Sequence, residues 1–239
     1  MNFFILILVL CLFIFLFALH FLAEDDFVLT RRDISLEKLF NIVFIICGVA
    51  LFFSRFFYGV FISKSIFANP FLFLLFPYYP GLSLLGGIVG GLIALFLWQS
   101  KDASFPRLRL FDFFSSALLC VLPIGFFGYF AMAGDSVLSL KPIFILLTYL
   151  ALVILAMIFI FPKLMEGKIK DGTAGFIFLT SFSFISLISH TLVKFNFLNY
   201  FKNLENIALL VMFFTSLILL FRQESLWTKI MEIRKKYQN

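Results

Sequence analysis

Seven long apolar segments constrain the fold of this chain more than any other feature of its sequence. They cover residues 2–22, 39–62, 82–98, 113–131, 142–161, 175–193 and 207–221. A helix needs about 20 apolar residues to cross the hydrocarbon core of a bilayer, and these segments have or approach that length. Charged residues make up only 13% of the chain, about half of their share in a soluble domain. We therefore expect an all-α integral membrane protein with about seven transmembrane helices.

Lysine and arginine residues are distributed unevenly among the connections between these segments. One set of alternate connections, together with the C-terminal tail, contains Arg31, Arg32, Lys38, Lys101, Arg107, Arg109, Lys163, Lys168, Lys170, Arg222, Lys229, Arg234, Lys235 and Lys236. The other set contains Lys64, Lys141, Lys194 and Lys202. Because cytoplasmic loops are enriched in Lys and Arg, the sequence predicts an N-terminus outside and a C-terminus in the cytoplasm. Residues 1–239 then form a single polytopic domain, of which 222–239 is a basic cytoplasmic tail.

Four glycines in the third segment leave one helix face without side chains. Gly86, Gly87, Gly90 and Gly91 form two interleaved pairs with small-xxx-small spacing. Such a face lets another backbone or a lipid approach closely. Each glycine costs a helix in water about 1 kcal/mol relative to alanine, so this segment is expected to be helical only within a bilayer or against neighbours.

Arg55 lies within the second apolar segment, in its outer half. An arginine at the bilayer centre costs at least about 2.5 kcal/mol on insertion scales, which makes an intramembrane arginine a functional candidate. Its long side chain also allows the charged group to reach the interface. Contact with a lipid phosphate or substrate and a role as interfacial or structural anchor are therefore both open.

The sixth segment carries most of the remaining polar side chains. Ser183, Ser186 and His190 are spaced i, i+3 and i+7, so they share one helix face. This polar stripe points to the bundle or to a cavity, and hydrogen bonding between helices is the simpler interpretation. No carboxylate on the same face orients His190, and no nucleophile with its base follows from the spacing.

Three polar residues stand at predicted helix ends. Ser35 is expected to cap the second segment, and Asp112 the fourth, because their oxygens accept from free amides at a helix start. Asp135 falls at the outer mouth after the fourth segment. It is either a loop residue or part of a site.

Several classes of function lack support in the sequence. No solvated basic run with interleaved aromatic residues is present, which argues against nucleic-acid binding. Cys11, Cys47 and Cys120 all lie inside apolar runs without metal-ligand spacing, so they are interpreted as small core residues. We expect neither a metal nor a cofactor.

Most of the chain resembles a known family in the order of its short motifs. Residues 34–38, 54–58, 69–70 and 81–90 are similar to a first cytoplasmic loop, an Ala-Arg-Leu-Gly-Tyr segment, an Asn-Pro turn and a Gly-Leu-Ser-Phe-His-Gly-Gly stretch. Asp112 resembles an aspartate that opens the fourth helix, and the sixth segment is similar from residue 172 onward. These are motifs of the prolipoprotein diacylglyceryl transferase family, bacterial membrane enzymes that move a diacylglyceryl group from phosphatidylglycerol to a lipobox cysteine thiol.

The resemblance implies a multi-pass protein of the bacterial cytoplasmic (inner) membrane, acting in lipoprotein biosynthesis. Its partners would be phosphatidylglycerol and the signal peptide of a preprolipoprotein. The positions that the resemblance assigns to lipid or substrate binding are Arg55, Tyr58, Ser83, Gly86, Gly87 and Ser186.

The chain departs from the family at the polar and charged positions that serve the reaction in the family. Leu85 stands where the family has a histidine, and residues 125–134 lack the arginine, both asparagines and the glutamate of the family signature. Ser186 and His190 replace an arginine and a glutamate. Proton transfer would then fall to His190 or Asp135.

Three functions remain open at this stage. The first is an active diacylglyceryl transferase. The second is a catalytically inactive relative that binds a lipid or a signal-peptide helix against the glycine face. A small transporter is the third, and the lack of paired intramembrane charges and of an inverted repeat argues against it.

Overall fold

The computed structural model describes residues 2–24, 26–68, 73, 81–98, 105–132, 140–191 and 203–224. Within these ranges the chain is helical and has no strand. Six stretches are long and apolar enough to cross a membrane. They are α1 (Asn2–Glu24), α3 (Leu36–Phe61), α6 (Arg107–Met132), Pro142–Met165, which joins most of α7 to α8, α9 (Thr173–Thr191) and α11 (Leu204–Gln223). The prediction of an all-α, multi-pass membrane protein is confirmed.

The predicted span at 82–98 forms a shorter helix than the others. This helix, α5, covers Leu84–Trp98 and has 15 residues. At about 1.5 Å per residue it is about 22 Å long, against about 30 Å for the hydrocarbon core. Six spans and one shorter apolar helix are thus present in the described part, and a seventh crossing stays a prediction.

Shorter elements connect the long helices. They are α2 (Phe27–Arg31), the 3₁₀ turn η1 (Lys64–Ala68) and α8 (Phe161–Met165), while α7 (Leu140–Leu155) passes into α8 through a π-helical turn, η2 (Ala156–Ile160). The hydroxyl of Ser35 accepts from the backbone N–H of Lys38 at 3.3 Å, which confirms Ser35 as the N-cap of α3. The carboxylate of Asp26 caps α2 in the same way, accepting from Val28 and Leu29.

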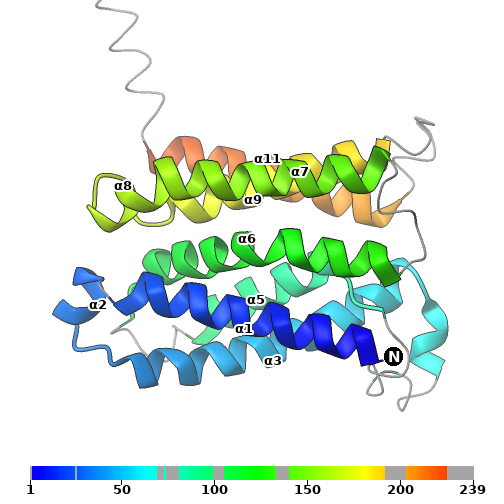
Figure 1. Cartoon of the computed structure of the whole chain (residues 1–239), viewed down its shortest axis with the longest axis horizontal. Helices are drawn as coiled ribbons and strands as arrows, with labels where there is room; N and C mark the ends of the chain where they lie inside the picture. Colours follow the sequence, from blue (N-terminus) through cyan, green and yellow to red (C-terminus); the bar gives the residue numbers. More distant parts are fainter. Residues whose placement is uncertain are drawn as a thin grey trace, which may run out of the picture.

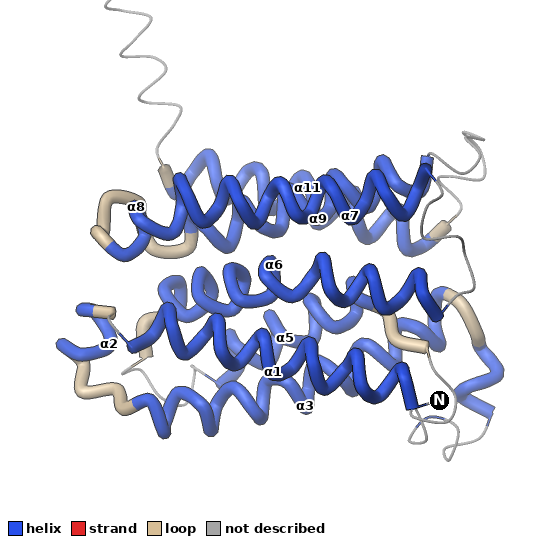
Figure 2. Tube along the Cα trace, viewed as in Figure 1, coloured by secondary structure: helices blue, strands red, loops and turns tan. Residues whose placement is uncertain are grey.

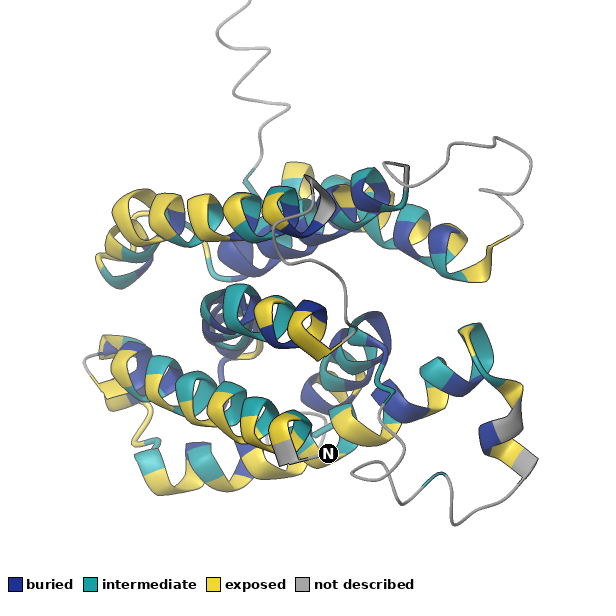
Figure 3. Ribbon diagram, turned by 45° about the vertical axis from the view of Figure 1, so that its right-hand side comes forward, coloured by how far each residue is buried: buried dark blue, intermediate teal, exposed yellow. Residues whose placement is uncertain are grey.

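The helices form two groups with α6 between them (Figures 1 and 2). On one side α3 packs along α5, and α1 packs along α6. On the other side α9 packs along α11, and both α7 and α9 contact α6. Buried residues face α6 and the helix pairs, whereas exposed residues lie on the outer surfaces (Figure 3). Exposed apolar side chains on these surfaces suit contact with lipid.

The two ends of the bundle differ in charge. Figure 1 places α2, α8 and the end of α11 at one end and the start of α1 at the other. The end with α2 and α8 therefore collects the described cations of the set predicted to be cytoplasmic: Arg31, Arg32, Lys38, Arg107, Arg109, Lys163, Lys168, Lys170 and Arg222. We call it the basic end and the other the outer end. Which end faces the cytoplasm stays a prediction.

Candidate functional site

A large cavity lies between the α1–α6 pair and the α3–α5 pair, and it is partly open to the outside of the bundle, where its lining residues Phe44, Gly48 and Leu51 are exposed. Its volume is about 490 Å³, within the range of about 300–1,000 Å³ typical of small-molecule sites. It exists because contacts between these two pairs are far fewer than contacts within each pair. The cavity is lined by Leu8, Cys11, Leu12 and Phe15 of α1, by one face of α3 between Phe44 and Ser54, by one face of α5 between Leu84 and Leu95, by one face of α6 between Phe111 and Val121, and by Phe178 and Leu179 of α9.

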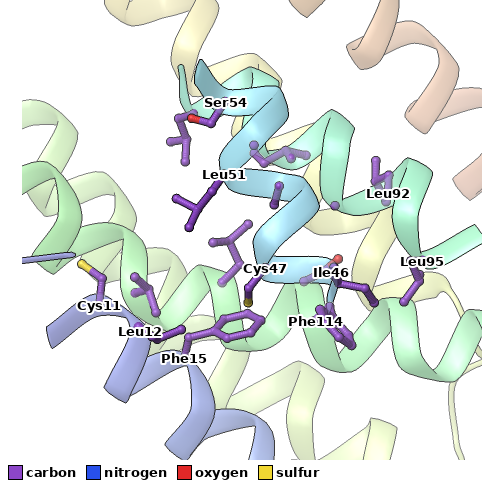
Figure 4. Close-up of a pocket in the computed structure, with 18 of the residues that line it drawn as sticks. Cys11, Leu12, Phe15, Ile46, Cys47, Leu51, Ser54, Leu92, Leu95 and Phe114 are labelled. Carbon is purple, nitrogen blue, oxygen red and sulfur yellow. The ribbon is translucent and has the colours of Figure 1, made fainter. Parts of the chain in front are cut away.

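The cavity wall is almost entirely apolar. Its polar lining residues are Ser54 and Ser115, together with the cysteines Cys11 and Cys47. Figure 4 shows Ser54 at one end of the cavity and the rings of Phe15 and Phe114 near the other. Cys11 and Cys47, interpreted above as core residues, thus border open space. An aliphatic chain fits such a wall and a polar solute does not.

The glycines of α5 divide between two surfaces. A Cβ atom on Gly86 would lie 2.6 Å from Cβ of Phe57, and one on Gly90 would overlap Phe53. These two glycines are therefore required for close packing of α5 on α3. Gly87 and Gly91 line the cavity, where an added Cβ would meet its nearest atoms at ordinary contact distances of 3.6 and 3.8 Å.

Polar groups join the end of α3 to the start of α5. Ser54 Oγ donates to the carbonyl oxygen of Ser83 at 2.7 Å, and the backbone N–H of Ser83 donates to the carbonyl oxygen of Ser54 at 3.0 Å. Ser83 Oγ accepts from the backbone N–H of Gly86 at 3.2 Å. Because α5 begins at Leu84, these bonds satisfy non-helical backbone within the bundle, which a membrane requires.

Arg55 also lies where the end of α3 meets the start of α5. Its side chain is buried, with 2% of the residue exposed. Nη1 donates to the carbonyl oxygen of Gly81 at 2.7 Å, and the guanidinium lies 5.7 Å from the ring centre of Tyr58. The Tyr58 ring packs on Gly81, where a Cβ would overlap it. We call Ser54, Arg55, Tyr58, Gly81 and Ser83 the α3–α5 junction.

The junction brings together most of the residues that the resemblance assigned to lipid binding. Arg55, Tyr58 and Ser83 belong to it, Gly86 follows it directly, and Gly87 lines the cavity beside it. A guanidinium offers several N–H donors in a planar fork that suits a phosphate. The arrangement therefore places a guanidinium, a group able to bind phosphate, next to Ser54 at one end of the apolar cavity; Arg55 itself is not part of the cavity lining.

Ser186 and His190 lie in the other group of helices. His190 Nδ1 is 2.5 Å from Oδ1 of Asn206 on α11, and Thr180 on α9 is hydrogen-bonded to Ser216 on α11 at 3.0 Å. Ser183 donates to the carbonyl oxygen of Leu179 in its own helix. Of the polar stripe, Ser183 is thus bonded within α9 and His190 to α11. Asp135, Asn69 and Pro70 lie outside the described residues.

A buried ion cluster at the basic end was not predicted from the sequence. Arg109 on α6 donates through Nε and Nη2 to Oδ2 of Asp26, at 2.9 and 2.5 Å. Its Nη1 lies 3.3 Å from Oδ1 of Asp171. Asp26 and Arg109 are 1% and 3% exposed. The cluster ties α6 to the α1–α2 turn and to the loop before α9.

Asp112 has a different role from the one expected. Because α6 begins at Arg107, Asp112 lies inside this helix and does not cap it. Its carboxylate accepts instead from the backbone N–H groups of Gly172 and Gly175, at 2.6 and 2.8 Å. Asp112 therefore caps α9 from a neighbouring helix.

The last described residues close the same end of the bundle. Oε1 of Glu224 accepts from Thr173 Oγ1 at 2.8 Å and from the backbone N–H of Lys170 at 3.3 Å. Gln223 Nε2 donates to the carbonyl oxygen of Asp171 at 2.7 Å. The start of α9 is therefore held both by α6 and by the end of α11.

In the described part of the chain, no three His, Cys, Asp or Glu side chains are grouped so that they could bind a metal ion. No family model, curated protein or solved structure matches the chain. Membership of the diacylglyceryl transferase family thus stays a prediction.

Proposed function

We propose that this protein binds a membrane phospholipid, with one acyl chain in the cavity between the α1–α6 and α3–α5 pairs. The observation that carries this proposal is an apolar cavity of about 490 Å³ bordered by α1, α3, α5 and α6. An apolar chain satisfies such a wall, because lipid tails and aliphatic side chains are equally apolar. The second chain of the lipid stays in the bilayer.

The α3–α5 junction supports the placement of the headgroup. It lies at the end of the cavity bordered by Ser54 and Leu84. The guanidinium of Arg55 there is the group that would hold the phosphate, with Tyr58 against it at 5.7 Å. A lipid bound in this way has its chain directed toward the basic end.

The family resemblance supports a more specific proposal, in which the lipid is phosphatidylglycerol and the protein transfers its diacylglyceryl group to a preprolipoprotein. In that reaction the cysteine sulfur bonds to the terminal glycerol carbon, the bond from that carbon to the phosphate oxygen breaks, and glycerol phosphate leaves with the electron pair. The thiol proton passes to a base. The resemblance leaves His190 and Asp135 as candidates for this base; His190 lies in the other group of helices, bonded to Asn206, so the transferase requires it to approach the α3–α5 junction.

A catalytically inactive lipid-binding protein is the alternative. The loss of the family's signature residues at 125–134 and at Leu85 favours it. In this case the cavity would hold a lipid without reaction, or the glycine face of α5 would hold a signal-peptide helix. Lipid binding in the cavity is therefore expected both for the transferase and for an inactive protein that holds a lipid.

Two native cysteines allow a direct test of lipid binding. Cys11 and Cys47 border the cavity, whereas Cys120 does not belong to its lining. The full chain in detergent is treated with a small membrane-permeant maleimide, with and without added phosphatidylglycerol, and labelling of each cysteine is followed by mass spectrometry. We expect the lipid to slow labelling of Cys11 and Cys47 and to leave Cys120 unchanged. Equal labelling at all lipid concentrations would contradict the proposal.

Gly48 offers a matched pair of variants for this test. It lines the cavity, and a Cβ there would have no atom within 4 Å. Gly48→Leu should narrow the cavity beside Cys47 and weaken the effect of the lipid on Cys47 labelling, whereas Gly48→Ala should largely retain it. Leucine also has a higher helix propensity than glycine, so loss of folding is not expected.

The transferase reaction has a separate test. Cells depleted of their own diacylglyceryl transferase are supplied with this chain, and thioether formation on lipoproteins is measured by mass spectrometry. Modification that is lost in Arg55→Ala would support the enzyme. No modified lipoprotein, with the protein shown to be in the membrane, would leave the inactive lipid-binding protein as the function.

A further inference from the structure

The cavity is elongated along the helix axes. Its wall covers residues 44–54 on α3, 84–95 on α5 and 111–121 on α6. At about 1.5 Å per residue, each of these walls is about 15 Å long. This length is about half of the 30 Å hydrocarbon core, which is the depth of one lipid leaflet. The cavity thus has the dimensions of a single acyl chain in one leaflet.

The two ends of the cavity have different chemistry. Ser54 and Leu84 border the outer end, next to the α3–α5 junction. Aromatic rings gather at the basic end, where Phe15 and Phe114 lie with ring centroids 5.8 Å apart (Figure 4). We call Phe15, Phe44, Phe111 and Phe114, which all line the cavity, the aromatic end wall.

One ring of the end wall, Phe111, is braced from behind. Phe111 is 2% exposed and lies in ring contact with Phe96 and Phe176, at 6.3 and 5.3 Å between centroids. Its ring packs directly on Gly175, where an added Cβ would overlap it. Gly175 is itself fixed by its hydrogen bond to Asp112. A chain that presses on this ring therefore meets a rigid structure and not a free side chain.

From this geometry we infer that the aromatic end wall sets the acyl-chain length of the lipid that the protein binds. The inference rests on the proposed lipid binding and names the property by which the lipid is selected. Transfer of a lipid tail from bilayer or detergent into the cavity gains little by itself, because both surroundings are apolar. Selection comes from fit: a short chain leaves a void, and a long chain is forced against the rings.

The experiment measures protection of Cys47 from the maleimide by phosphatidylglycerols that carry two identical saturated chains, from lauroyl to arachidoyl. The full chain in detergent is used throughout. We expect one chain length to protect best and overlong chains to protect about tenfold more weakly, as for overpacking of a core. In Phe114→Leu, which shortens the end wall, the optimum should move to longer chains.

The control is Phe126→Leu, a change of the same kind on the same helix. Phe126 is half-buried like Phe114, but it stacks on Tyr149 at 5.1 Å and is not part of the cavity wall. Its optimum should equal that of the unmodified protein. Phe15→Leu, which opens the end wall from α1, should repeat the shift of Phe114→Leu and replaces it if that variant does not fold.

The possible failures are distinguishable. If phosphatidylglycerol of no chain length protects Cys47, the proposed lipid binding itself is overturned. If all chain lengths protect equally, or if Phe114→Leu and Phe15→Leu leave the optimum where it was, lipid binding stands and the end wall does not select chain length.

Discussion

The two glycine pairs of α5 have the same composition and spacing but opposite surroundings. Gly86 and Gly90 face α3 so closely that no Cβ fits, with Phe57 Cβ only 2.6 Å from the position it would take on Gly86. Gly87 and Gly91 face the cavity, where a Cβ does fit. One pair is required for packing, and the other leaves space for a ligand. A small-residue face in a membrane helix can therefore serve two purposes, and spacing alone does not separate them.

The largest loss of stability is expected for the buried ion pair at the basic end. This loss is the reference for the smaller effects expected at the Gly86/Gly90 face and the Gly87/Gly91 face of α5. Arg109→Met removes the partner of Asp26 inside the protein and should cost about 3–5 kcal/mol, as for other broken buried pairs. The measurement is the thermal unfolding temperature in detergent. Arg107→Met, at an exposed position on the same helix, should leave that temperature nearly unchanged.

The next largest loss of stability is expected at the face of α5 that packs on α3, which is formed by Gly86 and Gly90. Gly86→Ala combined with Gly90→Ala gains about 1 kcal/mol per residue in helix propensity, but each methyl group overlaps α3 and costs about 1–3 kcal/mol. We expect net destabilisation by up to about 4 kcal/mol, seen as a lower unfolding temperature. An unchanged unfolding temperature would show that α3 and α5 are not in close contact.

The face of α5 that borders the cavity, formed by Gly87 and Gly91, should gain stability when its glycines are replaced by alanine. Gly87→Ala with Gly91→Ala keeps ordinary contacts and should raise stability by up to about 1 kcal/mol per residue through helix propensity. The same methyl groups narrow the cavity, so protection of Cys47 by phosphatidylglycerol should weaken. A variant that melts earlier, or that binds lipid as before, would remove the distinction between the two faces.

The smallest effect is expected on α6. A Cβ on Gly128 would lie 2.5 Å from Cγ2 of Ile7 and 3.2 Å from its Cβ, so accommodation needs a rotamer change of Ile7 or a small shift of α1, which lies on the outside of the bundle. Gly128→Ala should therefore change the free energy of unfolding by less than about 1 kcal/mol, because a gain in propensity offsets a local shift. A loss as large as that of the Gly86/Gly90 variant would mean that α1 is held as rigidly as α3.

Local pattern was sufficient for much of the fold. Hydropathy predicted the positions of the long helices, because a spanning helix must be apolar along its length and must satisfy its backbone hydrogen bonds within its own segment. Charge in the connections gave the grouping of Arg31, Lys163 and Arg222 at one end of the bundle. Ser35 was recognised as a cap because its partner, Lys38, is three residues away.

Interactions between segments that are distant in the sequence could not be predicted from local pattern. Asp112 was expected to cap its own helix, but its partners are Gly172 and Gly175, far along the chain. The pairing of Arg109 with Asp26 likewise joins separate connections. The cavity could not be predicted either, since it depends on how far two helix pairs stand apart.

The capping of α9 also bears on how the chain assembles in a membrane. Domains form from the N-terminal end as synthesis proceeds, so Asp112 is already in place when α9 enters the bilayer. Glu224, which binds Thr173 and Lys170, arrives only after α11. The basic end is thus completed by the last helix that the structure describes, and a chain that stops before Glu224 leaves the first turn of α9 without two of its hydrogen bonds.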